Sequence, residues 1–214
     1  ASALRGTHSV AMKETTLSRK DFDTFAIEGF APRMDVIKGT LRPKLVAIAE
    51  RLVPAVSELV GTPMFVHVAK HARRTVNPPP ETWAAFAHEA RGYKKLPHFA
   101  LAVSKAGIHA RLVLKDEAVE ARARLTKALP KKLSTLAPLL SAAHARDYIH
   151  WDCETLPDEL GAKSDGLKEM ARKAALKTGV FDLGIYLGKW QGDEAVLEGF
   201  KALLPVYSLA AAKK

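Results

Sequence analysis

Basic and imidazole side chains are concentrated in one stretch of this sequence, between Met64 and Phe99. It holds six Lys and Arg residues against only Glu81 and Glu89, and four of the eight histidines. Arginine offers a fork of donors suited to phosphate or carboxylate, lysine a mobile point charge, and asparagine both a donor and an acceptor. The pattern predicts an anion-binding site, for which the candidate residues are Lys70, His71, Arg73, Arg74, Asn77, Lys94, Lys95 and His98. A solvated basic surface is the alternative.

His71 and His98 are the candidate catalytic residues, because an unperturbed imidazole titrates close to neutral pH and can serve as general acid or base. Neighbouring cations lower the pKa of such a ring and favour its neutral, proton-accepting form. The sequence has no GxSxG elbow, Walker loop or GxGxxG fingerprint, and Cys153 lies in no recognisable nucleophile motif. The reaction, if there is one, and any cofactor stay unassigned.

The spacing of His67 and His71 raises the question of a metal site, since two ligands four residues apart share one face of a helix. We expect no metal there. MFVHV has the composition of a strand, no acidic residue occupies the metalloprotease position between the histidines, and adjacent cations disfavour a divalent ion.

Aromatic residues are interleaved with the basic ones at Trp83, Phe86, Tyr93 and Phe99. Single-strand nucleic-acid binders combine these two residue types, because bases stack on aromatic rings while cations track the phosphates. No RNP-type motif is present, and aromatics at strand spacing are more often part of a core. Nucleic-acid binding is therefore an alternative, and a small anionic ligand is the favoured partner.

Composition indicates a globular protein of a reducing compartment. The chain has 214 residues, 48% hydrophobic and 26% charged, with a net charge of +10 that favours anionic partners. A single cysteine permits neither an intramolecular disulfide nor a finger-type zinc site. We find no transmembrane run and no apolar secretory segment, so we expect a cytoplasmic location without membrane association.

The elements that must position these side chains follow from periodicity. Residues 1–17 are expected to be a disordered lead-in, residues 18–208 a single domain and residues 209–214 a frayed tail. Apolar residues at three- and four-residue steps predict helix over residues 32–60, with Pro43 and Pro54 causing a bend or dividing it into two packed helices. Further helices are expected over residues 116–129, 164–177 and 193–204, the last ended by Pro205.

Strand-type composition or alternation marks residues 64–68, 99–104, 108–114 and 181–187, which we predict to form one sheet. DYIHWD, residues 147–152, is a further expected strand. The last of the four sheet segments places Gly184 and Gly188 on one face with Tyr186. Glycines there indicate close approach by backbone or ligand, or alternatively a bulge or packed helix. The whole pattern predicts an α+β fold, mostly antiparallel sheet with helices packed against it.

Two blocks of this sequence, residues 21–34 (DFDTFAIEGFAPRM) and residues 67–99 (HVAKH to KKLPHF), resemble the YktB family of uncharacterised bacterial proteins. The resemblance implies one α+β domain similar in topology to the biotin-ligase and class II synthetase catalytic domains. It implies no activity and supplies no catalytic residues. Its second block coincides with the segment chosen above on side-chain chemistry.

We therefore expect a cytoplasmic protein that binds a small phosphate- or carboxylate-bearing ligand. An enzyme that acts on such a ligand through His71 or His98 is the second hypothesis. A nucleic-acid-binding module is the third, and it requires a long basic stripe in place of a convergent pocket.

Overall fold

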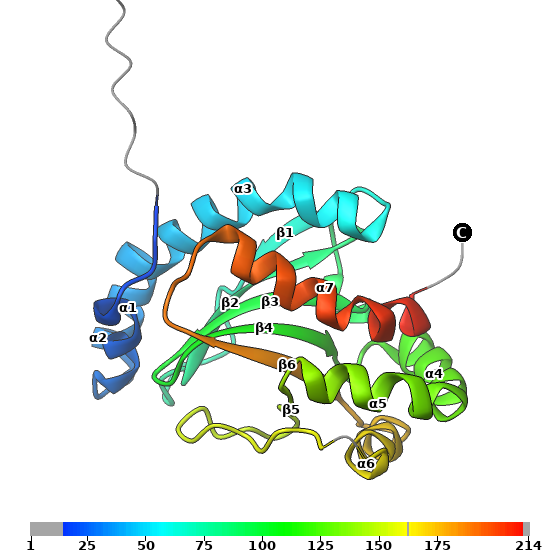
Figure 1. Ribbon diagram of the computed structural model, residues 1–214. Coiled ribbons are helices and arrows are strands. Elements are labelled where there is room, and N and C mark those ends of the chain that lie inside the picture. Colours follow the sequence, from blue (N-terminus) through cyan, green and yellow to red (C-terminus); the bar gives the residue numbers. More distant parts are fainter. Residues whose placement is uncertain (1–14, 162, 212–214) are drawn as a thin grey trace, which may run out of the picture.

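The computed structural model describes residues 15–161 and 163–211 (Figure 1). Most of the expected lead-in lies outside the described residues, but Leu17, its last position, is buried in the core. At the other end the last helix runs to Ala210, so the first two positions of the expected tail are helical. The expectation for the remaining tail falls largely on residues 212–214, which lie outside the description.

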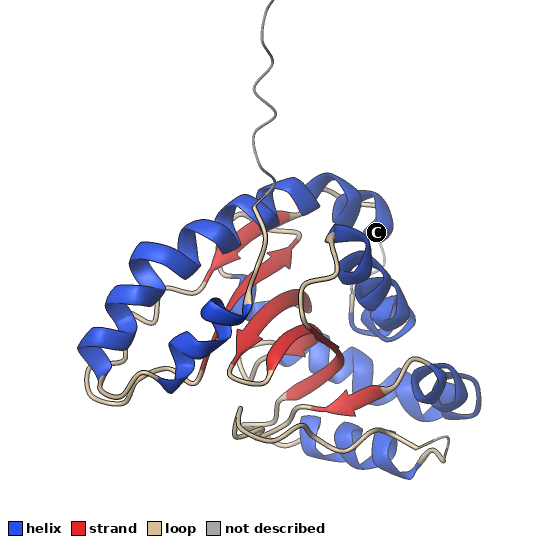
Figure 2. Cartoon of the chain, turned by 60° about the vertical axis from the view of Figure 1, so that its left-hand side comes forward, coloured by secondary structure: helices blue, strands red, loops and turns tan. Residues whose placement is uncertain are grey.

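Six strands form one antiparallel sheet in the order β1-β2-β3-β4-β6-β5. Figure 2 shows them as one curved layer. Their bounds are β1 Phe65–Val68, β2 Glu81–Ala87, β3 His98–Ser104, β4 Gly107–Leu114, β5 Ala145–Asp147 and β6 Phe181–Gly188. The four segments predicted to share a sheet do so, and the α+β class with a mostly antiparallel sheet is confirmed. The finer expectation of a biotin-ligase-type topology stays a prediction.

The helices lie mainly over one face and one end of the sheet. Long helices α3 and α7 lie along the same side of the sheet, and α4, α5 and α6 gather near β5 and β6 (Figure 1). The bounds are α1 Arg19–Asp23, α2 Phe30–Val36, α3 Arg42–Val60, α4 Val119–Ala128, α5 Leu133–Ala142, α6 Asp165–Ala174 and α7 Asp193–Ala210. Short 3-10 segments cover Thr24–Ala26, Tyr93–Lys95 and Leu129–Lys132, and Ile37–Leu41 form a π-helical turn.

The apolar core lies between the sheet and helices α3 and α7. Phe99 of β3 stacks on Phe200 and Tyr207 of α7, with ring centroids 4.9 and 4.8 Å apart. A Cβ at Gly199 would lie 2.7 Å from the Cβ of Ala110, so glycine is what lets α7 approach β4 this closely. Side chains of β4 point alternately to the two faces of the sheet. As predicted, those that enter this core are Ile108, Ala110, Leu112 and Leu114.

The prolines interrupt the helices less than expected. The chain stays helical from Phe30 to Val60 and does not fold back as two packed helices; its irregularity is the π-helical turn just before Pro43. Helix α7 likewise continues through Pro205, which was wrongly expected to end it. An internal proline costs about 3 kcal/mol. Burial of Val206 and Tyr207 beyond it offsets that cost, at roughly 1.5–3 kcal/mol per large apolar side chain.

The segment DYIHWD was wrongly assigned as a strand. Strand β5 ends at Asp147, Tyr148 N still donates to Asp182 O of β6 at 2.8 Å, and the residues that follow form no further strand. Tyr148 is buried, and His150 and Cys153 have positive φ angles of 60° and 66°, which a strand does not permit. This segment instead places Tyr148 and Trp151 against the sheet face that α3 and α7 leave uncovered.

That second face carries polar side chains in place of an apolar core. Arg111 of β4 lies at its centre and donates through Nε to Asp182 of β6 at 2.9 Å and through Nη1 to Glu81 of β2 at 2.5 Å. Its Nη2 donates to Asp182 as well. The Arg111 side chain is 7% exposed and that of Asp182 5%. The three residues connect strands β2, β4 and β6 by one buried ionic network.

Gly184 provides the room for that network. A Cβ there would lie 2.7 Å from both Arg111 Cγ and Tyr148 Cε2. The close approach predicted from this glycine is therefore made by the protein's own side chains. A register shift between Ile108 and His109, opposite the end of β6 near Gly188, matches the alternative of a bulge.

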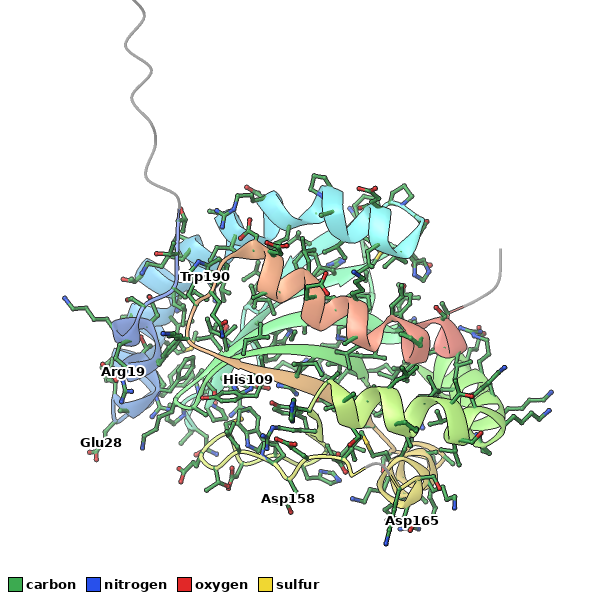
Figure 3. The ribbon with its side chains drawn as sticks, viewed as in Figure 1. Arg19, Glu28, His109, Asp158, Asp165 and Trp190 are labelled. Carbon is green, nitrogen blue, oxygen red and sulfur yellow. The ribbon has the colours of Figure 1, made fainter. Side chains whose placement is uncertain are left out.

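His109 is buried on the same face, between β4 and the segment that follows β5 (Figure 3). Its Nδ1 lies 2.9 Å from Tyr148 Oη and its Nε2 lies 3.0 Å from Ser104 Oγ. Burial, followed by the charges of Arg111 and Arg146, lowers the pKa of His109 to about 3. The ring is therefore neutral, with both nitrogens hydrogen-bonded.

Replacing Arg111 with Met should reduce the free energy of unfolding by about 3–5 kcal/mol, because Glu81 and Asp182 would keep buried charges without a partner. Adding Asp182→Asn should recover part of the loss by removing one of those charges. Urea denaturation followed by circular dichroism measures both variants. If Arg111→Met is as stable as the parent, the network contributes no net stability.

Stability should also fall below pH 6.5. The unfolded His109 takes up a proton near that pH and the folded one does not until about pH 3, so each pH unit between them costs about 1.4 kcal/mol. His109→Gln should reduce the slope of the unfolding free energy against pH by up to about 1.4 kcal/mol per pH unit, the contribution of one proton. Urea denaturation at pH 7 and pH 5 measures that slope. His150→Asn, at an exposed position, is the control. Equal slopes in parent and His109 variant would contradict the assignment.

Candidate functional site

The predicted basic segment begins on edge strand β1 and turns back into β2. Ala69 N donates to Trp83 O at 2.9 Å, which continues the pairing of the two strands to the start of the turn. The turn is tied to the first helices by two arginines: Arg42 Nη2 donates to Lys70 O at 3.2 Å, and Arg33 Nη1 donates to Pro79 O at 3.1 Å. These contacts hold both ends of the segment that carries the predicted cations.

His71 is held in a left-handed conformation within this turn, with φ at 52°. Such a conformation is uncommon for residues other than glycine, and it clusters at functional sites. Nε2 of His71 lies 3.0 Å from the buried hydroxyl of Thr82, and the ring meets Trp83 edge to face at 5.4 Å. Burial, then the charges of Arg74 and Arg42, lowers the pKa of His71 to about 4, so the ring is neutral at physiological pH.

Three aromatic or imidazole rings lie beside this turn. Tyr93, in the 3-10 segment before β3, stacks on His67 with centroids 4.7 Å apart and planes inclined by 23°. Trp83 Nε1 donates to Tyr93 Oη at 3.3 Å. His67 Nε2 donates to the carbonyl of Glu89 at 2.9 Å. The rings therefore fix one another, and burial raises the pKa of the Tyr93 phenol.

Between these segments lies a groove of about 580 Å³, which we call the β1–β2 groove. Its polar lining consists of Lys70, His71, Arg73, Arg74 and Lys94, with His67, Trp83 and Tyr93 as its ring-bearing residues. Val66, Val68, Ala69 and Ala72 complete it. Within the part of the chain that the structure describes, no carboxylate lines the groove.

The cations of the groove have no ionic partners among the residues that the structure describes. Among the described residues, no ion pair or hydrogen bond engages the side chains of Lys70, Arg73, Arg74 or Lys94. Elsewhere arginines are committed to structure: Arg122 donates to carbonyls at the end of α6, and Arg146 bonds Glu159 at 2.7 Å. The positive charge of the groove is thus uncompensated.

Five of the eight predicted site residues line the groove, and three do not. Asn77 and Lys95 are exposed outside it. His98 is 1% exposed and lines a small adjoining chamber with Glu81, Trp83, Arg111 and Lys115. Its Nδ1 donates to Leu96 O at 3.0 Å, and burial lowers its pKa to about 3. The two catalytic candidates thus lie in different cavities.

Sequence reasoning missed or misassigned several participants. Arg42 is more than twenty residues before the segment, and its reach to the turn becomes visible only once α3 packs beside β1. Trp83 and Tyr93 were noted only as possible base platforms, and His67 only as a possible metal ligand. The buried ion pair between Arg111 and Asp182 joins residues far apart in the sequence, so no local pattern indicated it.

Neither a metal centre nor a membrane span is visible in the described residues. Residues 15–161 and 163–211 hold no group of three His, Cys, Asp or Glu side chains placed to bind a metal ion. The same ranges include no helix with the length and apolar character needed to cross a bilayer.

Comparison with known proteins gives a consistent assignment. A family model described as "Domain of unknown function (DUF1054)" matches residues 17–207. The UPF0637 protein of Bacillus cytotoxicus is 33% identical over 204 residues, which covers 91% of this chain and 97% of that protein. The UPF0637 protein of Lysinibacillus sphaericus is 32% identical over 214 residues, covering 94% of this chain and 99% of that protein.

Another relative matches a shorter part of the chain at higher sequence identity. The UPF0637 protein of Bacillus velezensis is 56% identical over 90 residues, which span 42% of this chain and 43% of that relative. The resemblance to the YktB family inferred from the two sequence blocks is thereby confirmed. This chain belongs to the family of uncharacterised bacterial proteins that carry the domain DUF1054.

Proposed function

We propose that this protein binds a small ligand bearing a phosphate or carboxylate in the β1–β2 groove. The supporting observation is the set of cations Lys70, Arg73, Arg74 and Lys94, which line one hollow where no described residue supplies a carboxylate to neutralise them. An anion that enters would replace water around charges that the described part of the chain leaves unpaired. Arginine forks bind phosphate or carboxylate in a bidentate manner, which adds geometric selectivity to the charge attraction.

The shape of the groove favours a small ligand over a nucleic-acid strand. Its volume of about 580 Å³ lies within the range of roughly 300–1,000 Å³ typical of small-molecule sites. A strand of nucleic acid would need a charged track that continues beyond this hollow. The four groove cations Lys70, Arg73, Arg74 and Lys94 instead line the hollow itself.

His71 favours the second hypothesis, an enzyme acting on the same ligand. It is neutral, lies in the groove beside the cations, and has its orientation set by Thr82 and Trp83. A neutral imidazole next to a bound anion can accept a proton from it. We also propose a cytoplasmic location, because a chain with a single cysteine fits a reducing compartment.

Replacing Arg73 and Arg74 together with Gln should abolish stabilisation by anionic ligands. A ligand at about one hundred times its Kd contributes roughly 2.7 kcal/mol, which raises the melting temperature of a protein of this size by about 5–11 °C. We expect such a shift in the parent with at least one member of a panel of sugar phosphates, nucleotides and di- and tricarboxylates. The measurement is differential scanning fluorimetry.

The matched control is Lys131→Gln with Lys132→Gln, which removes the same charge from an exposed pair outside the groove. It should keep the full shift. If the Arg73 and Arg74 variant folds and still responds to each active ligand, the groove is not the binding site. If it fails to fold, Arg73→Lys with Arg74→Lys, which retains the charge, separates a structural role from binding.

Salt dependence distinguishes the groove from a nucleic-acid surface. A protein that neutralises several phosphates along a single strand shows a slope of about −0.7 per contact in a log–log plot of affinity against salt. We expect weak, sequence-independent nucleic-acid binding that disappears near physiological salt, while the ligand-induced thermal shift persists. Fluorescence polarisation with a labelled oligonucleotide at 50 and 200 mM salt provides the measurement. Tight oligonucleotide binding at the higher salt would favour the nucleic-acid hypothesis.

A further inference from the structure

The size of the β1–β2 groove shows that its cations cannot be the whole of the recognition surface. A bare inorganic anion would contact the cations of the 70–74 turn and leave most of about 580 Å³ unfilled. Apart from Lys94, the remaining lining consists of small apolar residues and the rings of His67, Trp83 and Tyr93. The groove therefore has a charged part and an apolar, aromatic part, and a ligand that fits must match both.

The aromatic part presents ring surfaces rather than polar groups. His67 Nε2 is engaged with Glu89 O, His71 Nε2 with Thr82 Oγ1, and Trp83 Nε1 with Tyr93 Oη. Within the part of the chain that the structure describes, the lining includes no Ser, Thr, Asn, Gln, Asp or Glu side chain. A polyol such as a sugar needs neutral donors and acceptors for its hydroxyl groups, and the groove offers few.

Flat rings, by contrast, suit this lining. Tyr93 and His67 lie nearly parallel at 4.7 Å and both line the groove, so a flat ligand ring there would meet other rings. Hydrogen bonding between Trp83 and Tyr93 fixes the orientation of both, which lowers the entropy lost when a ligand ring packs against them. Aromatic pairs prefer offset-stacked or edge-to-face contacts, and both arrangements occur among the residues of this groove.

We infer that the ligand is an aromatic or heteroaromatic compound bearing a phosphate or carboxylate, with its flat ring packed against Tyr93 and Trp83 and its anionic group bound by Arg73 and Arg74. The inference rests on the proposed function and names the chemical class of its ligand. Simple sugar phosphates and aliphatic acids are the classes that it excludes as preferred ligands.

Two matched pairs of probes test this assignment by isothermal titration calorimetry. Phenyl phosphate and cyclohexyl phosphate have the same charge and similar size, but only the first is flat. Adenosine 5′-monophosphate and ribose 5-phosphate differ by the base alone. We expect the aromatic member of at least one pair to bind about 5- to 100-fold more tightly, the range that one base stacked on an aromatic side chain provides.

Variants then locate the ring contact. Tyr93→Leu should lower the affinity for the aromatic member of a pair to about that of its non-aromatic partner, and Tyr93→Phe should retain the preference. Phe65→Leu is the matched control, because Phe65 is an exposed ring on neighbouring β1 that does not line the groove. Circular dichroism shows whether Tyr93→Leu remains folded.

The outcomes separate the two proposals. Equal affinities within both pairs, with binding that still depends on Arg73 and Arg74, would overturn the ring assignment and leave the anion site standing. A preference for the aromatic members that survives in Tyr93→Leu would overturn the placement of the ring. Absence of binding by all four probes and by inorganic phosphate would overturn the proposed function together with this inference.

Discussion

The face of the sheet that α3 and α7 leave uncovered carries charged and imidazole side chains that are largely shielded from water. The Glu81–Arg111–Asp182 network stabilises this face by pairing its buried charges. A buried charge is tolerated only when it is paired and hydrogen-bonded. The network links three strands, Gly184 leaves space for it, and Tyr148 lies 5.1 Å from the guanidinium. The position of the segment after β5 follows from this arrangement.

The β1–β2 groove differs from that interior because it lies at the free edge of the sheet. Strand β1 has a neighbour on one side only, so the turn after it can expose Lys70, Arg73 and Arg74 to solvent. Their charges need no partner there for the fold to be stable, since water solvates them. A ligand bound there, as we propose, would leave the strand pairing intact. Buried and exposed arginines therefore have different roles in this protein, the first structural and the second available for binding.

The two regions meet at Trp83. Its ring lines the groove, and Lys115 lies 5.8 Å from its centroid on the side of the inner chamber that also contains His98 and Arg111. Because β2 contributes both Trp83 and Glu81, the strand that bears the groove wall is also anchored by the buried network. The rigid interior thus supports an edge site whose ring residues are held in fixed positions.

The sequence by itself determined the α+β class, four of the six strands of the sheet and the face of β4 that enters the core, because side-chain alternation is a local property. It also located most of the candidate cations, since they are close together in the chain. Only the tertiary structure decided the rest. The continuation of α7 past Pro205 depends on core burial, the partners of Arg111 come from distant strands, and the separation of His98 from His71 follows from strand register. These features depend on contacts between residues far apart in the sequence, which no local pattern encodes.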